Sequence, residues 1–187
     1  GTSYVNTTDA PIIRYGEVLM NYAEAAAELG TLTQAELDKS LNVLRARAGV
    51  NLPKLEILAG QPAVNGKVYD DPNRDASVTS LLWEIRRERR AELIFEGFRL
   101  DDLKRWKKLD YADTQKNPAI NTGAYVDKSK YTADQLRTIT LNSAGYIIAS
   151  PIAKREVQAK HYLEPIPLDQ ITLYQNNGSE LTQNPGW

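Results

Sequence analysis

One charged segment of this chain places four glutamates at every fourth position, with arginines between them. They are Glu84, Glu88, Glu92 and Glu96. Two such carboxylates in one cleft could serve as the acid–base pair of a glycoside hydrolase. They could also hold a pair of metal ions, but helical metal sites of that kind use Glu-x-x-His pairs and the chain has one histidine, His161. In a third interpretation, arginines simply neutralise them.

We favour neutralisation, because like charges at this spacing destabilise a helix by about 0.2–0.5 kcal/mol per pair. An inward-facing carboxylate needs an arginine and further hydrogen bonds to offset its desolvation. We therefore expect a buried ionic network that includes at least one side chain of Arg86–Arg90 or of Glu88 and Glu92, and we predict that the chain is not an enzyme. The cations expected from neighbouring elements are Arg14, Arg45, Arg47 and Arg99.

The acidic stretch DDPNRDAS is a second candidate site. Asp71, Asn73 and Asp75 repeat the D-x-N-x-D start of a calcium-binding loop, but Ala and Leu occupy its sixth and twelfth positions, where Gly and Glu are required. The alternative, which we favour, is that Asp75 or Ser77 caps the helix that follows. We expect no bound metal and no cofactor.

Aromatic residues form the third candidate group: ten tyrosines and three tryptophans against two phenylalanines. Tyr and Trp combine a flat apolar face with a polar edge, which suits wet interfaces and stacking against sugar rings. The same residues could instead pin loops to the helices. The candidate ligand-binding residues lie in long loops and are Tyr69, Tyr111, Tyr125 and Tyr131.

Composition excludes several classes of protein. With 23 Lys+Arg against 24 Asp+Glu, the net charge of −1 provides no field to attract nucleic acid. The absence of cysteine excludes disulfides and thiolate metal sites. No run of about 18 apolar residues could span a membrane. No signal peptide is visible, and the abrupt start GTSYVNTTDAP suits a piece of a longer precursor.

The spacing of apolar residues predicts a mostly α fold with about four main helices and little β structure, the helices lying near residues 12–29, 33–48, 77–95 and 100–109. Gly30 should end the first helix, a Thr33/Glu36 capping box should open the second, and Gly97 should mark the last bend. The residues expected to form the buried stripe of the first helix are Tyr15, Val18, Leu19, Tyr22, Ala26 and Leu29.

The helices pair into two hairpins of about tetratricopeptide length, fewer than the roughly three repeats that independent stability requires. Long irregular loops are expected at about 51–76 and 111–150. Within the second, Tyr146–Ser150 is a short apolar run that could pair as a strand. A further helical turn should start at Leu168 or Asp169, and the terminal Trp187 should be docked.

Five blocks of the sequence, in order, resemble the C-terminal part of the SusD/RagB family: RYGEVLMNYAEAAAELG, LNVLRARAGV, LLWEIRRERRAELIFEGFRLDDLKRWKK, YLEPIPLDQI and LTQNPGW. The resemblance implies one helical domain over residues 1–187, as a portion of an outer-membrane, cell-surface nutrient-binding lipoprotein of Bacteroidetes type. Family members are anchored through a lipidated cysteine, which this chain lacks, as a truncated piece would.

The resemblance further implies capture of a glycan or peptide nutrient, most simply a polysaccharide, and its transfer to a SusC-like TonB-dependent transporter. The matching blocks are family framework, so no family binding residue is carried onto this chain. The alternative function is a tetratricopeptide-like scaffold that docks a protein partner and no small molecule. That alternative predicts an exposed apolar patch of roughly several hundred Å² on the first hairpin.

Overall fold

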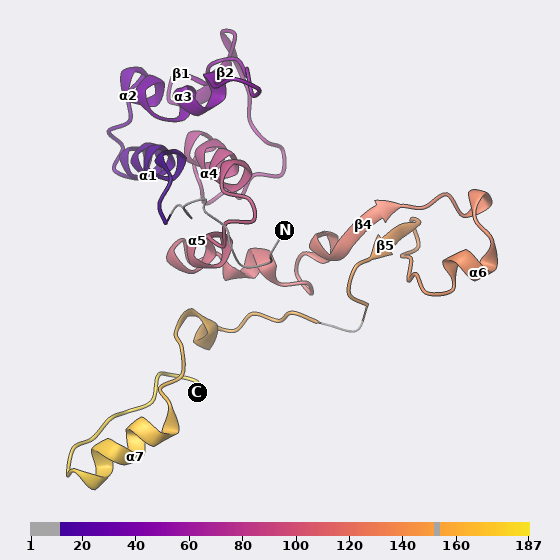
Figure 1. The fold of residues 1–187 in the computed structure, drawn as a ribbon. Helices are drawn as coiled ribbons and strands as arrows, with labels where there is room; N and C mark the ends of the chain where they lie inside the picture. Colours follow the sequence, from indigo (N-terminus) through magenta and orange to yellow (C-terminus); the bar gives the residue numbers. More distant parts are fainter. Residues whose placement is uncertain (1–11, 152–153) are drawn as a thin grey trace, which may run out of the picture. The chain divides into compact units, whose positions relative to one another are not determined.

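The computed structural model describes residues 12–151 and 154–187 (Figure 1). Its contacts divide the chain into two compact units, Gly1–Phe98 and Arg99–Trp187. Of the described residues, 43% are helical and 10% lie in strands, which confirms a mostly α fold with little β structure. The tetratricopeptide-like arrangement stays a prediction. No helix in the described part of the chain is long and apolar enough to cross a membrane.

The first unit is built from helices and one small antiparallel sheet. Its elements are α1 (Tyr15–Glu28), α2 (Gln34–Lys39), α3 (Leu41–Ala46), β1 (Glu56–Leu58), β2 (Gln61–Val64), β3 (Lys67–Val68) and α4 (Ser80–Glu92). Helix α1 packs on α4 and α3, α2 packs on β1, and β2 contacts α4. The sheet, in the order β1-β2-β3, falls within the predicted loop at 51–76.

Local signals at the first helix boundaries are confirmed. Gly30 adopts φ +69° and its N–H bonds to the carbonyl of Ala27, while Thr31 N–H bonds to Ala26, the two bonds of a Schellman end. Thr33 and Glu36 form the predicted capping box at the start of α2. Each boundary is therefore fixed by residues within one turn of it.

Two other predictions about helices are wrong. The second helix is broken at Ser40 into α2 and α3, because the buried Ser40 hydroxyl donates to the Glu36 carbonyl at 2.7 Å and competes with the helical backbone bonds. Helix α4 is capped by Thr79, whose side chain accepts from Leu82 N, and not by Asp75 or Ser77. These two residues instead bond to each other in the preceding turn, with Ser77 N 2.8 Å from Asp75 Oδ1.

The core of the first unit is small and contiguous. Its fully buried members are Met20, Ala23, Leu37, Leu41, Leu55 and Ile85. The stripe predicted for α1 is only partly right: Leu19 and Ala26 are buried, whereas Tyr15, Val18, Tyr22 and Leu29 are exposed. The ion pair of Arg14 with Glu92 lies over Gly16, where a Cβ would come within 2.2 Å of Arg14 Nη1 and 3.0 Å of Glu92 Oε1. Helix α1 thus has apolar residues on its exposed face as well as on its buried one.

The second unit contains shorter elements. They are α5 (Arg99–Arg105), η1 (Leu109–Ala112), η2 (Pro118–Asn121), β4 (Thr122–Tyr125), η3 (Lys128–Lys130), α6 (Ala133–Leu136), β5 (Tyr146–Ile148), η4 (Ala159–Tyr162) and α7 (Leu168–Asn176). The predicted strand at Tyr146 exists as β5, which pairs with β4 in an antiparallel ribbon (Figure 1). The predicted helical start at Leu168 and the docking of Trp187 are also confirmed, since the Trp187 indole donates to the carbonyls of Lys160 and Leu163, each at 3.1 Å.

Two polar ties hold segments of this unit that are distant in sequence. The buried Asp113 carboxylate accepts from Val157 N at 3.0 Å and Gln115 N at 2.7 Å. Its neighbour Thr114 exchanges backbone and hydroxyl bonds with Arg155. Further along, the Asn121 carboxamide bonds to both the N–H and the carbonyl of Ser150, at 3.0 and 2.8 Å. The segment that carries β4 and β5 is therefore held by side-chain hydrogen bonds at both of its ends.

Candidate functional site

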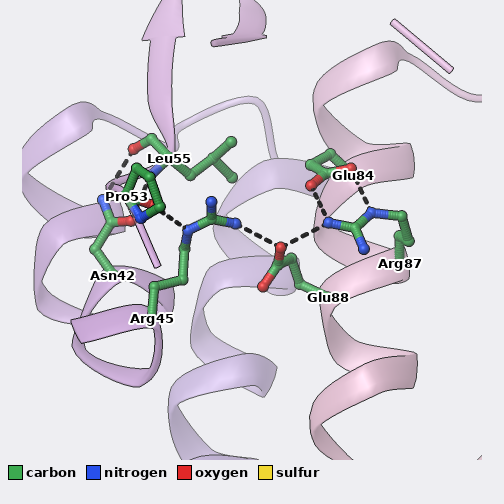
Figure 2. Close-up of polar contacts among 7 residues, drawn as sticks. All are labelled: Asn42, Arg45, Pro53, Leu55, Glu84, Arg87 and Glu88. Carbon is green, nitrogen blue, oxygen red and sulfur yellow. Dashed lines mark hydrogen bonds and ion pairs between the residues drawn. The ribbon is translucent and has the colours of Figure 1, made fainter. Parts of the chain in front are cut away.

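The predicted ionic network exists on α4, where Glu88 lies between Arg45 of α3 and Arg87 of α4, and Arg87 also binds Glu84 (Figure 2). Arg45 of α3 donates from Nη1 to Glu88 at 2.5 Å and from Nε to the Pro53 carbonyl at 2.6 Å. Arg87 bridges Glu84, at 2.5 Å, and Glu88, at 2.8 Å. The side chains of Arg45 and Glu88 are only 7% and 14% exposed, so this pair is largely removed from water.

The other two glutamates of the series bind arginines in the same way. Glu92 accepts from Arg14 and Arg47, each at 2.6 Å. Glu96 accepts from Arg14 Nε at 2.7 Å. The expected cations Arg14, Arg45 and Arg47 therefore serve the series, and the fourth, Arg99, lies 5.6 Å from the Trp106 ring.

The carboxylates differ in their ionisation. Burial raises the pKa of Glu84, but the hydrogen bonds from Arg87 and Tyr69 and the charges of Arg87 and Arg45 outweigh it, so that the pKa falls below 4.5. Glu92 is lowered in the same way, with Arg47 and Arg14 outweighing burial. Burial dominates at Glu88 and raises its pKa above 4.5 despite the charges of Arg45 and Arg87. The pKa values of Glu84 and Glu88, one turn apart on α4, are thus shifted in opposite directions.

We expect Glu84→Gln and Glu88→Gln to change the acid limb of the stability curve in opposite senses. Because the folded-state pKa of Glu84 is depressed, its contribution is present above pH 4.5 and is lost as pH falls through the folded pKa, so Glu84→Gln should flatten the limb. The raised pKa of Glu88 makes its contribution grow as pH falls through that pKa towards 4.5, so Glu88→Gln should steepen the limb. Urea midpoints from pH 3 to 7 measure both slopes.

Equal slopes for Glu84→Gln and Glu88→Gln would contradict the assignment of burial as the dominant influence on Glu88.

A cavity of about 200 Å³ adjoins the network. Its walls are Met20, Leu41, Leu44, Val50, Leu52 and Ala91 together with Arg45, Arg47, Glu88 and Glu92. It is smaller than the roughly 300–1,000 Å³ of ordinary ligand pockets, and its charged groups bind one another. This arrangement suits a framework that fixes how α3 and α4 dock on α1, rather than an acid–base cleft.

The acidic stretch at 71–75 uses its oxygens in local bonds. Asp71 accepts from Asn73 N at 2.8 Å and from the indole of Trp83 at 3.0 Å, and Asp75 accepts from the backbone and hydroxyl of Ser77. Among the described residues there is no group of three or more His, Cys, Asp or Glu side chains that could hold a metal ion. The bonds with Asn73 and Ser77 are those of turns that lead into α4, and the bond with Trp83 ties Asp71 to that helix.

The four candidate tyrosines are divided between the two units of the chain. Tyr69 belongs to the first unit, where its ring packs against the core and its hydroxyl bonds to Glu84; burial, followed by that bond, raises its pKa well above the usual value. The other three belong to the second unit: Tyr111 lies in η1 with Lys108 Nζ 5.7 Å from its ring, and Tyr125 and Tyr131 are 62% and 51% exposed. Only the latter two present large aromatic faces to solvent.

Sequence reasoning missed two residues of interest. Tyr146 lies beside Tyr125, with ring centroids 5.5 Å apart and planes at 65°, but the strand register that joins them is not visible in the sequence. Glu24, on the buried face of α1, lies 3.6–3.7 Å from the guanidiniums of Arg89 and Arg86 and is only 3% exposed. The alanines on either side of Glu24 in the sequence were the one sign that this glutamate lies on a closely packed face.

Comparison with known proteins gives one match. The model of the SusD family (SusD_RagB) matches residues 1–187, the whole chain. Searches of curated proteins and of solved structures found no significant match. Proteins of this family are nutrient-binding proteins associated with outer-membrane uptake, and they are binding proteins rather than enzymes. The family membership predicted from the five sequence blocks is thereby confirmed, and this chain belongs to the SusD family.

Proposed function

We propose that this chain is part of a cell-surface lipoprotein that captures a glycan and passes it to a TonB-dependent transporter in the outer membrane. The observation that carries the proposal is the family match over all 187 residues. The proposal includes the absence of catalysis, a single domain of the family over residues 1–187, and a lipid anchor on the longer precursor.

The described residues offer two kinds of support. The glutamates that could have formed a hydrolytic pair bind arginines instead, and the cavity that Glu88 and Glu92 line is smaller than an ordinary ligand pocket. The second unit presents exposed tyrosines on short elements, and an exposed aromatic face is suited to a sugar ring. We retain Tyr111, Tyr125 and Tyr131 as ligand-binding candidates, and Tyr69 as a weaker one because its ring packs against the core.

A binding screen tests the proposed function. The chain and its full-length precursor should each be titrated with soluble starch, xylan, mannan and mixed-linkage β-glucan, and with a peptide digest of casein, by isothermal titration calorimetry. We expect saturable binding of at least one glycan, with no release of reducing ends on prolonged incubation. Binding of the peptide digest alone would change the proposed ligand from a glycan to a peptide. Turnover of any glycan would contradict the proposal that the protein is not an enzyme.

One observation favours the alternative, a scaffold for a protein partner. Tyr15, Val18, Tyr22 and Leu29 follow one another three, four and seven residues apart along α1 and leave 48–77% of their surface exposed. A helix with an apolar stripe at this spacing is suited to pair with another helix. The scaffold function predicts that the screen finds no glycan or peptide ligand even for the full-length protein, so the same titrations separate the two functions.

A further inference from the structure

Two tyrosines on the β4–β5 ribbon form a pair that the packing of the second unit does not cover. Tyr125 and Tyr146 are direct cross-strand partners, so their side chains project from the same face of the ribbon. Their rings meet edge to face at a centroid distance of 5.5 Å. Tyr125 is 62% and Tyr146 41% exposed, and large parts of both rings face solvent.

The backbone around the pair is shaped to hold it. Gly145 adopts φ +86°, and a Cβ at this position would come within 3.0 Å of Tyr125 Cε2, so the glycine provides the space in which the ring lies. The Gly145 carbonyl accepts from Val126 N at 2.9 Å, which ties the turn to the end of β4. The Asn142 carboxamide accepts from Tyr146 N and Ala144 N, each at 3.0 Å. Both rings are therefore held by a bonded turn, which lowers the entropy lost when a ligand binds.

The surroundings of the pair fit a neutral ligand. Residues 122–148 contain three cations, Lys128, Lys130 and Arg137, and two anions, Asp127 and Asp134, so their net charge is close to zero. The carboxylate of Asp127 is already bonded to the N–H and hydroxyl of Ser129. A phosphate or a carboxylate would find no dedicated cluster of donors in this segment. An aromatic face favours instead a ligand with its own flat apolar side and polar edges.

The hydroxyl groups of the pair add hydrogen-bonding capacity at its edge. The hydroxyl groups of Tyr125 and Tyr146 make no hydrogen bond to other described residues. Each can therefore donate to and accept from a ligand hydroxyl while the ring face contacts C–H groups. A pyranose ring has this combination, with C–H groups on one face and hydroxyls around the rim.

We propose that Tyr125 and Tyr146 form a stacking subsite for one neutral sugar ring of an oligosaccharide. The proposal rests on the glycan-binding function proposed above, and it adds the subsite, the partner Tyr146 and the preference for uncharged sugars. Tyr125 supplies the more exposed ring, and the edge-to-face contact with Tyr146 fixes the orientation of that ring.

The test uses the 187-residue chain and four neutral probes: maltohexaose, cellohexaose, xylohexaose and mannohexaose. For the probe that binds, Tyr125→Ala and Tyr146→Ala should each raise Kd by roughly threefold to tenfold, because a stacked aromatic contact is lost. Tyr125→Phe should retain most of the affinity. Tyr174→Ala, on a tyrosine of α7 that is 46% exposed, is the matched control and should leave Kd unchanged.

A measurement on the unaltered chain protects the test against a variant that misfolds. With ¹³C-labelled tyrosine, addition of the probe should shift the ring signals of Tyr125 and Tyr146 and leave that of Tyr174 in place. If a probe binds while these two signals stay fixed and both alanine variants keep their Kd, the subsite is wrong and the glycan-binding function stands. If none of the neutral probes and none of the larger glycans binds, the proposed function fails and the subsite fails with it.

Discussion

Replacing Arg45 with methionine is expected to destabilise the first unit by about 3–5 kcal/mol, the usual cost of removing one partner from a buried ion pair. Arg45 is 6% exposed and binds both Glu88 and the Pro53 carbonyl (Figure 2). Without it, Arg87 is the one arginine left on Glu88 among the described residues, and its side chain is 52% exposed. The Pro53 carbonyl also loses the hydrogen bond from Arg45. Equilibrium urea unfolding followed by far-UV circular dichroism measures the loss.

The matched control is Arg47→Met. Arg47 has a similar ion pair with Glu92, but its side chain is 46% exposed and Glu92 keeps Arg14, so the expected cost is about 0–1 kcal/mol. The double variant Arg45→Met/Glu88→Leu should recover most of the lost stability, because it removes both buried charges together. Equal costs for Arg45→Met and Arg47→Met would show that burial does not set the strength of this network.

The second large effect is expected at Asn42. Its carboxamide pairs with both backbone groups of Leu55, accepting from N at 2.7 Å and donating to O at 2.9 Å, and Leu55 is fully buried. Asn42→Ala leaves the Leu55 N–H unpaired inside the unit, at a cost of about 1–3 kcal/mol, to which the loss of packing adds. Native-state hydrogen exchange should show the Leu55 amide losing its protection.

Gln34→Ala is the comparison for Asn42→Ala. Gln34 also donates to the Leu55 carbonyl, at 3.1 Å, and accepts from Ile57 N, at 2.8 Å, but it is only half-buried. Its loss leaves the Leu55 carbonyl bonded to Asn42, so the destabilisation should be smaller. An unchanged exchange rate at Leu55 in Asn42→Ala would mean that water or another group replaces the carboxamide.

The sequence predicted features that depend on neighbours in the chain or on charge balance. The Thr33/Glu36 capping box and the Gly30 end each require residues only a few positions apart. Pairing of the glutamate series with Arg14, Arg45 and Arg47 was predictable because a buried carboxylate without a cation is too costly to persist. Such an argument identifies the partner only as an arginine or a lysine. Individual arginines could be named because few of them lie in the neighbouring elements.

Features that depend on tertiary position were not predictable. Helix α1 carries apolar residues around much of its circumference, so periodicity alone did not reveal that Met20 and Ala23 are buried while Tyr15 and Tyr22 are exposed. The break at Ser40 is equally hidden, because a serine inside a helix is unremarkable until its hydroxyl bonds to a carbonyl one turn earlier. The pairing of Tyr125 with Tyr146 required a strand register across twenty intervening residues.

The ties at Asp113, Thr114 and Asn121 have a consequence for how this protein can change. They bring residues 155–157 back to 113–114 and Ser150 back to Asn121, so the excursion that carries β4 and β5 begins and ends at clamped points. The hydrogen bonds at its two ends offset much of the entropy lost when this loop closes. Each doubling of the loop length would lower the free energy of unfolding by only about 0.6 kcal/mol. The segment between the ties should therefore tolerate insertions and substitutions. New aromatic residues within it can alter what is recognised while the residues at its two ends keep their positions.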